Sequence, residues 1–373
     1  MKLNKNINYL FICPYLINQS GHDYNYMMSV RNIFKKNKLS FQILSPKIYP
    51  KTKDFFLSQN LPTHPKKFFS KILYCFNFSK VLNNIIYLNY KNDEKKIIFL
   101  ESFHFIHFII VLLNIVLKKN FYLGVLLRYK NIFNVKSNLI NNVFFVIRDL
   151  FFKNKLIFFT DSSKIQNFYS NKNIHINLLP IPHIKTKNFF DNIFNDNDIS
   201  LWLPGPPREE KNISTIFNIL LKTKKLPISL FLSKDVGQKF NNIKNININF
   251  VKPILSEFEY FSFFEKIDFI FLPYMPHVYS YSTSGIFVES ISSNIPAFVT
   301  KGTWMDDEYK RFGIDLFTIE INDNLFVNLY EKVIFFKSNG CNNFNQMVKE
   351  YRNFHKPNNF LEKLTCNVNK FIL

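Results

Sequence analysis

Short apolar runs alternate with segments of helical pattern along this chain, and no other sequence feature restricts its fold as strongly. The first half contains a helix-like segment at 24–37, and the pattern begins again after residue 198 with another at 212–223. Short strands that alternate with helices are typical of β-α units with parallel sheets, so we predict an α/β fold with two Rossmann-like open parallel-sheet domains. The apolar runs that predict strands cover residues 7–15, 40–46, 95–102, 154–163, 199–205, 227–233, 246–253, 269–274 and 296–302.

The length of the chain also favours two domains, because 373 residues exceed the ~250–300 at which single cores stop growing. An Asn- and Asp-rich stretch at 191–198 marks a linker. We predict an N-terminal domain at 1–185, a C-terminal domain at 198–355 and a tail at 356–373 that packs back on the N-terminal domain. The four cysteines are widely separated and form no Cys-x-x-Cys pair, which favours a reducing, cytoplasmic compartment over a disulfide framework.

Two apolar segments could be mistaken for targeting or membrane segments. Residues 1–16 begin basic and turn apolar, but they contain no small-residue cleavage site, so a first strand is favoured over a signal peptide. The longest apolar stretch, 103–117, is 15 residues long and contains two histidines and an asparagine. Because a bilayer crossing needs ~20 residues, we predict a buried helix there.

Positive charge is concentrated in the first half of the chain. Residues 1–190 contain 28 Lys and Arg against 7 Asp and Glu, whereas residues 191–373 contain 20 of each. A codon bias toward lysine would not deplete carboxylates in one half only, so an anionic partner is indicated: a membrane surface, a nucleic acid or an acidic polymer. Segments 68–92 and 142–155 mix lysines with apolar residues, and each is either an ordinary helix or an amphipathic segment that rests on anionic lipid.

The stretch YSTSGIFVES holds one of only eight glycines in the chain, where average usage would give about three times as many. It follows an apolar run, and Ser284-Gly285 begins a helix whose first N–H groups and macrodipole favour phosphate. Glu289, one turn deeper on the same face as Gly285, could accept hydrogen bonds from ribose hydroxyls. The alternative is that Ser284 only caps the helix and that Glu289 is solvated, although its apolar neighbours favour burial with a partner.

A second polar corner, LWLPGPPREEKN, follows the first apolar run of the C-terminal half. Gly205 and two prolines shape a tight turn, after which Arg208 and Lys211 are expected on one helical face. A guanidinium offers phosphate a bidentate fork and an ammonium offers a point charge. The alternative is a surface ion-pair cluster with Glu209 and Glu210.

The segments 205–212, 178–183 and 271–300 resemble those of GT-B glycosyltransferases, most of all the retaining family 4 group. The resemblance covers most of the chain in order and is most specific over 201–212 and 270–304. It implies two domains that face each other across a cleft. It also implies a retaining, hexosyltransferase-like enzyme that uses Arg, Lys and helix dipoles in place of a divalent metal ion to neutralise the leaving diphosphate.

The resemblance assigns roles to the donor-site residues. Arg208 and Lys211 bind the donor diphosphate and stabilise the departing phosphate, next to Gly205. The amides of Thr283, Ser284 and Gly285 lie at the phosphate, and Glu289 holds the donor ribose. Two features depart from the family: Tyr281 replaces a glutamate that often contacts the transferred sugar, and the Arg–Lys spacing is shorter than in many members.

The N-terminal half is expected to supply the acceptor side. Gly21-His22 resembles the glycine loop that faces the donor, although a Gly-His pair in a loop can also be incidental. Glu101 and His104 lie at the end of an apolar run, where a cleft residue would lie, and His104 is the candidate for a catalytic or sugar-orienting role. The alternative is a core histidine, and His107 is expected to be structural.

These observations predict a glycosyltransferase that moves a sugar from a nucleotide-diphosphate sugar to a hydroxyl of a glycan or lipid-linked acceptor. It would act in cell-surface polysaccharide synthesis, in the cytoplasm or on the inner face of the cytoplasmic membrane, with the basic half on the anionic surface. No cofactor or metal is expected beyond the nucleotide-sugar co-substrate. The alternatives are a sugar-nucleotide epimerase with the same fold and a basic nucleic-acid-binding protein. The latter is disfavoured, because no nucleic-acid-binding motif is present.

Overall fold

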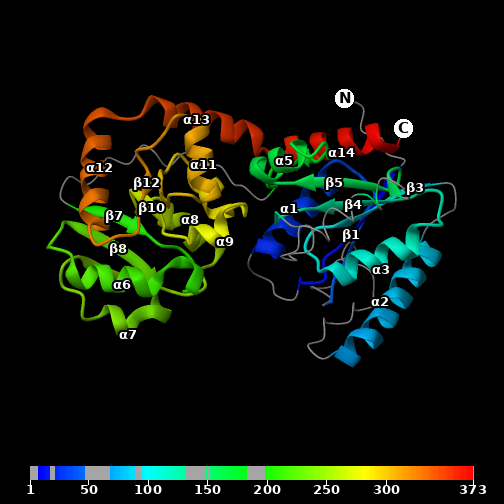
Figure 1. The fold of residues 1–373 in the computed structure, drawn as a ribbon, viewed down its shortest axis with the longest axis horizontal. Coiled ribbons are helices and arrows are strands. Elements are labelled where there is room, and N and C mark those ends of the chain that lie inside the picture. The colour runs from blue at the N-terminus through cyan, green and yellow to red at the C-terminus, as the bar shows by residue number, and fades with distance from the viewer. Residues whose placement is uncertain are drawn as a thin grey trace. The chain divides into compact units, whose positions relative to one another are not determined.

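The protein is described by a computed structural model that covers residues 7–16, 22–46, 68–89, 94–130, 146, 148, 152–182 and 198–372 (Figure 1). The chain divides into two compact units. The N-terminal unit contains Met1–His183 and Lys356–Leu373, and the C-terminal unit contains Ile184–His355. Each unit is built on one open sheet whose strands are all parallel, which confirms the predicted α/β class.

The sheet of the N-terminal unit has the strand order β2-β1-β3-β4-β5-β6. Its order reverses at β1, which pairs with β2 on one side and with β3 on the other. The strands are β1 (Ile7–Ile12), β2 (Phe41–Leu44), β3 (Lys95–Leu100), β4 (Phe121–Leu126), β5 (Leu156–Thr160) and β6 (Asn177–Leu178), and the helices of this unit are α1 (His22–Lys36), α2 (Phe68–Asn89), α3 (Phe105–Ile115), α5 (Ser163–Ser170) and α14 (Pro357–Ile372).

The core of this unit joins the first and last helices to the sheet. Phe11 of β1 packs edge-on against Phe34 of α1, with ring centroids 5.4 Å apart. The last helix belongs to the same core, because Phe360 of α14 is fully buried and its ring lies 6.1 Å from that of Tyr26. Residues from 357 onward therefore stabilise the N-terminal unit and not the unit that precedes them in sequence.

Strand β4 was not predicted from the sequence. It follows α3 closely, because only Lys118, Lys119 and Asn120 separate the apolar stretch 103–117 from the strand. Its glycine is required by packing, because a Cβ at Gly124 would lie 2.8 Å from Cδ2 of Phe99 on the neighbouring strand. Gly124 is therefore a further position, besides the glycines of the two corners, at which close packing explains why the chain has a glycine.

Helix α3 differs from the fully buried helix that was predicted. Phe108 and Val111 are buried, but Leu113 is 68% exposed on the other side of the helix, and Leu117, just beyond its end, is 94% exposed. The sequence shows hydrophobicity all round the helix and so cannot distinguish complete burial from an apolar outer face. Among the described helices, none has the length and hydropathy needed to cross a bilayer.

The sheet of the C-terminal unit has the order β12-β11-β10-β7-β8-β9. It also reverses, at β7, which pairs with β8 on one side and β10 on the other. Open α/β sheets bind ligands at such a switch point, outside the carboxyl ends of the strands. The elements are β7 (Ile199–Trp202), β8 (Ile228–Ser233), β9 (Asn247–Val251), β10 (Phe269–Leu272), β11 (Ala297–Thr300), β12 (Thr318–Ile319), α6 (Ile213–Lys222), α7 (Gly237–Phe240), α8 (Glu257–Phe264), α9 (Pro276–Tyr279), α10 (Gly285–Ser292), α11 (Trp304–Arg311), α12 (Leu325–Asn339) and α13 (Asn342–Phe354).

Candidate functional site

The two polar corners of the C-terminal unit lie side by side at the switch point of its sheet. One corner, 203–212, follows β7, and the other, 273–284, follows β10, and these two strands are neighbours. The backbone N–H of Met275 donates to the carbonyl of Glu210 at 2.8 Å. The side-chain amide of Asn212 donates to the carbonyl of Pro273 at 2.7 Å. These two hydrogen bonds hold the corners together, so residues as far apart in sequence as Asn212 and Pro273, 61 positions, form one site.

The second corner ends at the N-terminus of helix α10. Ser284 caps this helix, because its Oγ accepts from the backbone N–H of Phe287 at 3.3 Å. The same side chain forms a hydrogen bond with the hydroxyl of Tyr274, whose pKa is raised mainly by burial. Gly285 has no positive φ and begins α10 as an ordinary first residue. A glycine at this position therefore matters because it has no Cβ at the start of the helix, and not because the backbone conformation is unusual.

Glu289 is buried in α10 and is not solvated. Its side chain accepts from the hydroxyl of Tyr260 in α8, with Oη to Oε2 at 2.7 Å. Burial and the nearby carboxylate raise the pKa of Tyr260 well above its usual value, so this phenol remains a donor. The ring of Tyr260 packs against Trp202 at the end of β7, with centroids 5.4 Å apart. A buried carboxylate is thus fixed one turn behind the opening of α10.

Lys211 is also buried, and it organises the first corner. Its residue is 1% exposed, and its Nζ donates to the carbonyls of Pro204 and Pro206, each at 2.8 Å. Gly205 between them has a φ of 77°, and a Cβ there would lie 3.2 Å from Nζ. Burial, and then repulsion by Arg208, lower the pKa of Lys211 to about 8. Because an ammonium has three N–H donors, the two carbonyls leave one for an anion.

Arg208 does not share a helical face with Lys211, contrary to the prediction. It has an extended φ of −140° and precedes the single 3₁₀ turn Glu209–Lys211, so its side chain points outward with 53% exposure. Its Nε lies 3.1 Å from Oε1 of Glu210, as in the surface ion-pair alternative. An exposed pair of this kind is worth little and can exchange one anionic partner for another.

Two further predicted residues lie within the second corner. Tyr281 and Thr283 are half-buried in the loop that joins α9 to α10. Their position on that loop, directly before Ser284, is compatible with contact to a bound ligand. The structure assigns them no further role.

The carboxyl edge of the N-terminal sheet holds a buried ion cluster that sequence reasoning missed. Glu101, Arg128 and Asp161 follow the ends of β3, β4 and β5, three adjacent strands. The guanidinium of Arg128 forms ion pairs with both carboxylates, its Nε lying 3.4 Å from Oδ2 of Asp161. Glu101 is 1% exposed, so this predicted cleft residue contacts Arg128 in the interior. The signal in the sequence was a polar residue at each strand end, but β4 had not been recognised.

His104 lies at the surface and is not a core histidine. It is the N-cap residue of α3, and its ring packs edge-on against Tyr15, with centroids 5.1 Å apart. His107 is fully buried, as expected for a structural residue. Its Nδ1 accepts from the backbone N–H of His104 at 2.9 Å, so its Nε2 carries the hydrogen and donates to Tyr74 Oη at 2.6 Å.

The predicted Gly21-His22 loop is only partly described. Gly21 lies outside the described residues, and His22 is described only as the first residue of the α1 backbone. Within the described ranges, no group of three or more His, Cys, Asp or Glu side chains could hold a metal ion.

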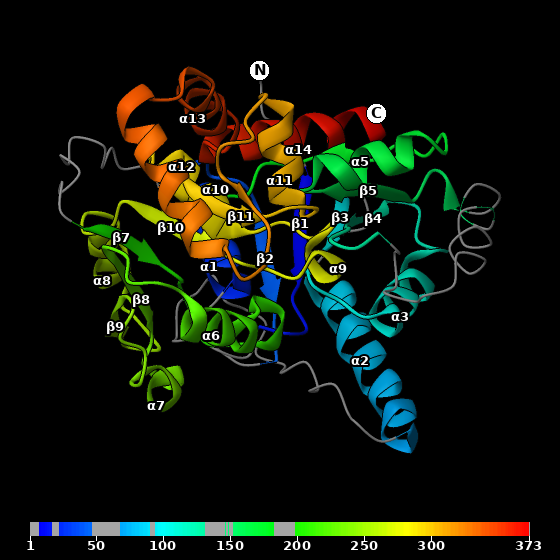
Figure 2. The same cartoon turned by 60° about the vertical axis from the view of Figure 1, so that its left-hand side comes forward.

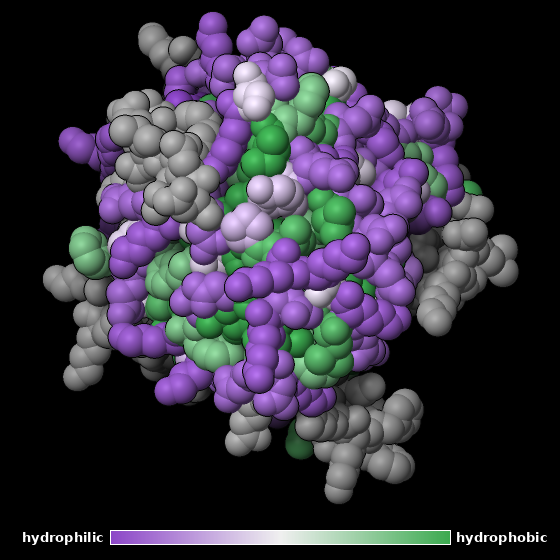
Figure 3. Space-filling model, turned by 90° about the vertical axis from the view of Figure 1, so that its left-hand side faces the viewer, coloured by the Kyte–Doolittle hydropathy of each residue, from purple (hydrophilic) through white to green (hydrophobic). Residues whose placement is uncertain are grey.

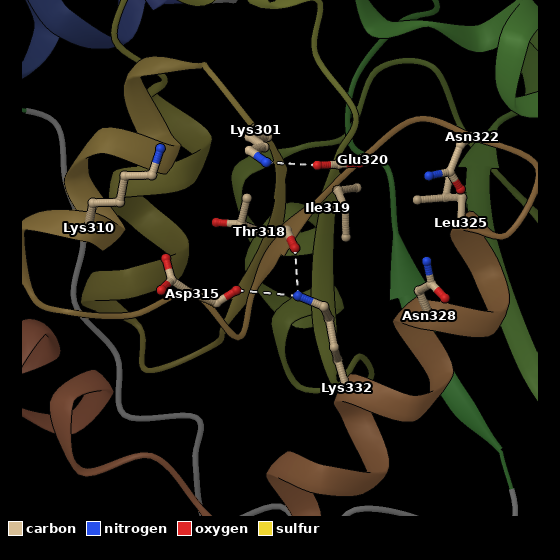
Figure 4. A pocket seen from close by; sticks show the side chains of 10 residues that line it. All are labelled: Lys301, Lys310, Asp315, Thr318, Ile319, Glu320, Asn322, Leu325, Asn328 and Lys332. Carbon is tan, nitrogen blue, oxygen red and sulfur yellow. Dashed lines mark hydrogen bonds and ion pairs between the residues drawn. The ribbon is translucent and has the colours of Figure 1, made fainter.

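A separate pocket of about 460 Å³ lies beside β12, the edge strand of the C-terminal sheet (Figure 4). Three lysines line it, and all three are held by neighbouring groups. Lys301 Nζ lies 2.8 Å from Oε1 of Glu320, Lys332 Nζ donates to the carbonyl of Thr318 at 2.8 Å, and Lys310 Nζ lies 2.7 Å from Oδ2 of Asp306. Its position at the sheet edge and its internally paired charges separate it from the site between β7 and β10.

Comparison with protein-family models and with curated protein sequences finds no match. Solved structures do match over almost the whole chain. A sucrose-phosphate synthase from Thermosynechococcus elongatus has a TM-score of 0.64 at 10% identity, covering 97% of this chain and 98% of its own. A glycosyltransferase from Rickettsia africae also has a TM-score of 0.64, at 13% identity and 98% coverage of both chains.

Anabaena HepE in complex with UDP-glucose has a TM-score of 0.60 at 9% identity, covering 97% of this chain and 99% of its own. WaaG, a glycosyltransferase of lipopolysaccharide biosynthesis, has a TM-score of 0.54 at 10% identity, with 96% and 98% coverage. All of these identities are low, so the likeness concerns the fold. The chain has the GT-B fold of two open parallel α/β sheets that these glycosyltransferase structures share.

Proposed function

We propose that this chain is a glycosyltransferase that uses a nucleotide-diphosphate sugar. The observation that carries the proposal is the junction of the corners 203–212 and 273–284, where an exposed guanidinium, a buried ammonium and a capped helix N-terminus surround one switch point. A diphosphate fits this combination of donors. The GT-B fold and the UDP-glucose bound to HepE support a nucleotide sugar as the ligand.

Each residue of the site then has a defined task toward the donor. The free N–H groups at the start of α10 bind one phosphate, and Arg208 exchanges Glu210 for the other. Lys211 fixes the Gly205 turn through the carbonyls of Pro204 and Pro206 and directs its remaining N–H to the diphosphate. Glu289, held by Tyr260, accepts from the ribose hydroxyls.

The proposed reaction transfers the sugar to an acceptor hydroxyl. The bond between the anomeric carbon and the diphosphate oxygen breaks, and the anomeric carbon forms a bond with the acceptor oxygen. The acceptor proton passes to the departing phosphate, whose negative charge Arg208, Lys211 and the α10 N-terminus stabilise. Retention of configuration and independence from a divalent metal follow from the resemblance to the family 4 group and are part of the proposal.

The acceptor side is proposed for the N-terminal unit. His104 is exposed at the carboxyl end of β3, so it can contact the transferred sugar or the acceptor. Glu101 acts indirectly, because its ion pair with Arg128 is internal. The acceptor would be a glycan or a lipid-linked glycan at the inner face of the cytoplasmic membrane, in the synthesis of a surface polysaccharide. The excess of basic residues in the first half supports this location.

The proposal is tested by thermal unfolding of the purified full chain with UDP, GDP, ADP and their sugar conjugates, since a ligand that binds only the folded state raises its melting temperature. Stabilisation by one nucleotide, lost in Arg208→Ala, is expected. No stabilisation by any of them would contradict the proposal. Incubation with the matching sugar nucleotide alone distinguishes an epimerase, which would convert the sugar without an acceptor.

A further inference from the structure

The outer side of α3 is apolar, although it faces away from the sheet. Helix α3 buries Phe108 and Val111 on its inner side. On its other side, Leu113 is 68% exposed, and Leu117, just past the helix, is 94% exposed. A helix at the surface of a globular protein normally carries polar side chains on this side. An apolar outer side therefore needs a partner other than water.

Helix α2 extends this surface. Tyr74 and Ser79 bind His107 and Asn114 of α3, so the two helices lie side by side, as Figures 1 and 2 both show. The inner side of α2 is buried like that of α3, and the exposed sides of both helices therefore point away from the interior of the unit. We call the resulting surface the α2–α3 outer face, formed by Leu73, Phe76, Lys80, Leu113 and Leu117. Leu73 is 62% and Phe76 is 69% exposed.

The charge around this face has one sign. Residues 68–89 and 102–120 contain four lysines and neither aspartate nor glutamate. Lys118 and Lys119 follow α3, and Lys155 adds a third ammonium there, because its Nζ donates to their carbonyls at 2.6 Å and 3.0 Å. In the C-terminal unit, by contrast, Lys252, Lys301 and Lys310 pair with carboxylates.

We propose that the α2–α3 outer face docks the N-terminal unit on an anionic phospholipid surface. Its apolar side chains enter the boundary between headgroups and acyl chains, and the lysines contact headgroup phosphates. A second copy of the chain fits less well, because a symmetric contact would bring the same lysines together. A nucleic acid would pair with the lysines but leave the apolar side chains exposed. The proposal adds a docking surface to the proposed peripheral location, and docking itself requires no catalysis.

The test is co-sedimentation of the full chain with vesicles of phosphatidylcholine, with or without added phosphatidylglycerol. The double variant Leu113→Gln/Leu117→Gln is expected to bind the anionic vesicles at least about tenfold more weakly than the wild type. Its matched control is Ile254→Gln/Phe258→Gln in the C-terminal unit, where the two side chains are 75% and 80% exposed. This control is expected to bind like the wild type.

The lysines are tested in the same assay. Lys80→Gln/Lys119→Gln is expected to weaken binding about fivefold per lysine on anionic vesicles. The exposed pair Lys224 and Lys225 of the C-terminal unit, also changed to Gln, is the control and is expected to have no effect.

Three outcomes would overturn the proposal: no binding of the wild type, equal binding to neutral and anionic vesicles, or undiminished binding of the leucine variant. Light scattering adds a fourth outcome. If the wild type is a dimer that does not bind vesicles, and the leucine variant is a monomer, the face serves self-association and the proposal is wrong. Nucleotide stabilisation of the leucine variant is measured in parallel and should equal that of the wild type. A failure of docking is therefore distinguishable from a failure of the glycosyltransferase assignment.

Discussion

The two units use the carboxyl ends of their central strands in opposite ways. In the C-terminal unit, the ends of β7 and β10 carry an exposed Arg208, one N–H of Lys211 and the start of α10, which together can receive an anion. In the N-terminal unit, the ends of β3, β4 and β5 carry Glu101, Arg128 and Asp161, where one guanidinium pairs with two buried carboxylates. The same topology thus carries the proposed anion site in one unit and an internal ion cluster in the other.

The surfaces of the units differ as well. Figure 3 shows hydrophilic side chains over much of one face of the C-terminal unit, with apolar areas between them. Its exposed cations at Lys252, Lys301 and Lys310 are paired with carboxylates. The α2–α3 outer face has no carboxylate of its own. We therefore propose that the C-terminal unit binds a small anion, and that the helix pair α2–α3 of the N-terminal unit attaches the protein to a phospholipid surface.

The largest expected effect is on stability, in the N-terminal ion cluster. Arg128→Met removes the guanidinium that pairs with the buried Glu101 and Asp161 and should destabilise the protein by about 3–5 kcal/mol. Chemical unfolding measures this change. Lys301→Met, which breaks an exposed pair, is the control and should leave the unfolding midpoint almost unchanged. Equal shifts in the two variants would contradict a buried cluster.

The next effect is on activity, at the exposed arginine of the donor site. Arg208→Ala should lower kcat/KM by about 10²- to 10³-fold, because it removes a stabilising charge from the transition state. Its melting temperature should stay close to that of the wild type, since the side chain is half exposed. Arg311→Ala, which removes a comparably exposed guanidinium paired with Glu308, should retain activity. Full activity of Arg208→Ala would remove this residue from the site.

A smaller effect is expected from pH. The pKa of Lys211 is lowered to about 8 by burial and by Arg208, and only the protonated ammonium attracts a diphosphate. Donor affinity should therefore be constant at lower pH and fall as pH rises through about 8, by up to about tenfold per unit. Lys211→Arg, whose guanidinium stays protonated, should flatten this profile. A profile that is equally steep in both proteins would assign the titration to another group.

The smallest effect concerns the support of the buried carboxylate. Tyr260→Phe removes the hydrogen bond to Glu289 and should cost about 1 kcal/mol of stability, together with a several-fold loss of donor affinity. Tyr330→Phe, on α12 outside the site, is the control. Calorimetric titration of the stabilising nucleotide measures the affinity. An unchanged affinity would show that Glu289 is positioned without Tyr260.

The sequence predicted most strands and helices because each one is a local pattern between polar loops. It failed at β4, where only Lys118, Lys119 and Asn120 separate the strand from the preceding apolar stretch. The donor corners were predictable because the residues of each corner are close in sequence. The Glu101–Arg128–Asp161 cluster was not, since only the parallel order of three strands brings it together.

Side-chain orientation within a corner was the other limit. Arg208 and Lys211 were expected on one helical face, but the left-handed Gly205 turn places two carbonyls around Lys211 and draws it inward. Arg208, in extended backbone before the turn, remains outside. A spacing of three residues cannot show this difference, because it depends on where a helix begins.

Hydrogen–deuterium exchange of the full chain, with and without the nucleotide that most raises its melting temperature, tests the central claim most directly. If the joined corners bind the donor diphosphate, amides in 203–212 and 281–289 will be protected more than those of any other part of the C-terminal unit. Protection confined to 301–332, around the pocket beside β12, or to the N-terminal unit, would contradict the account.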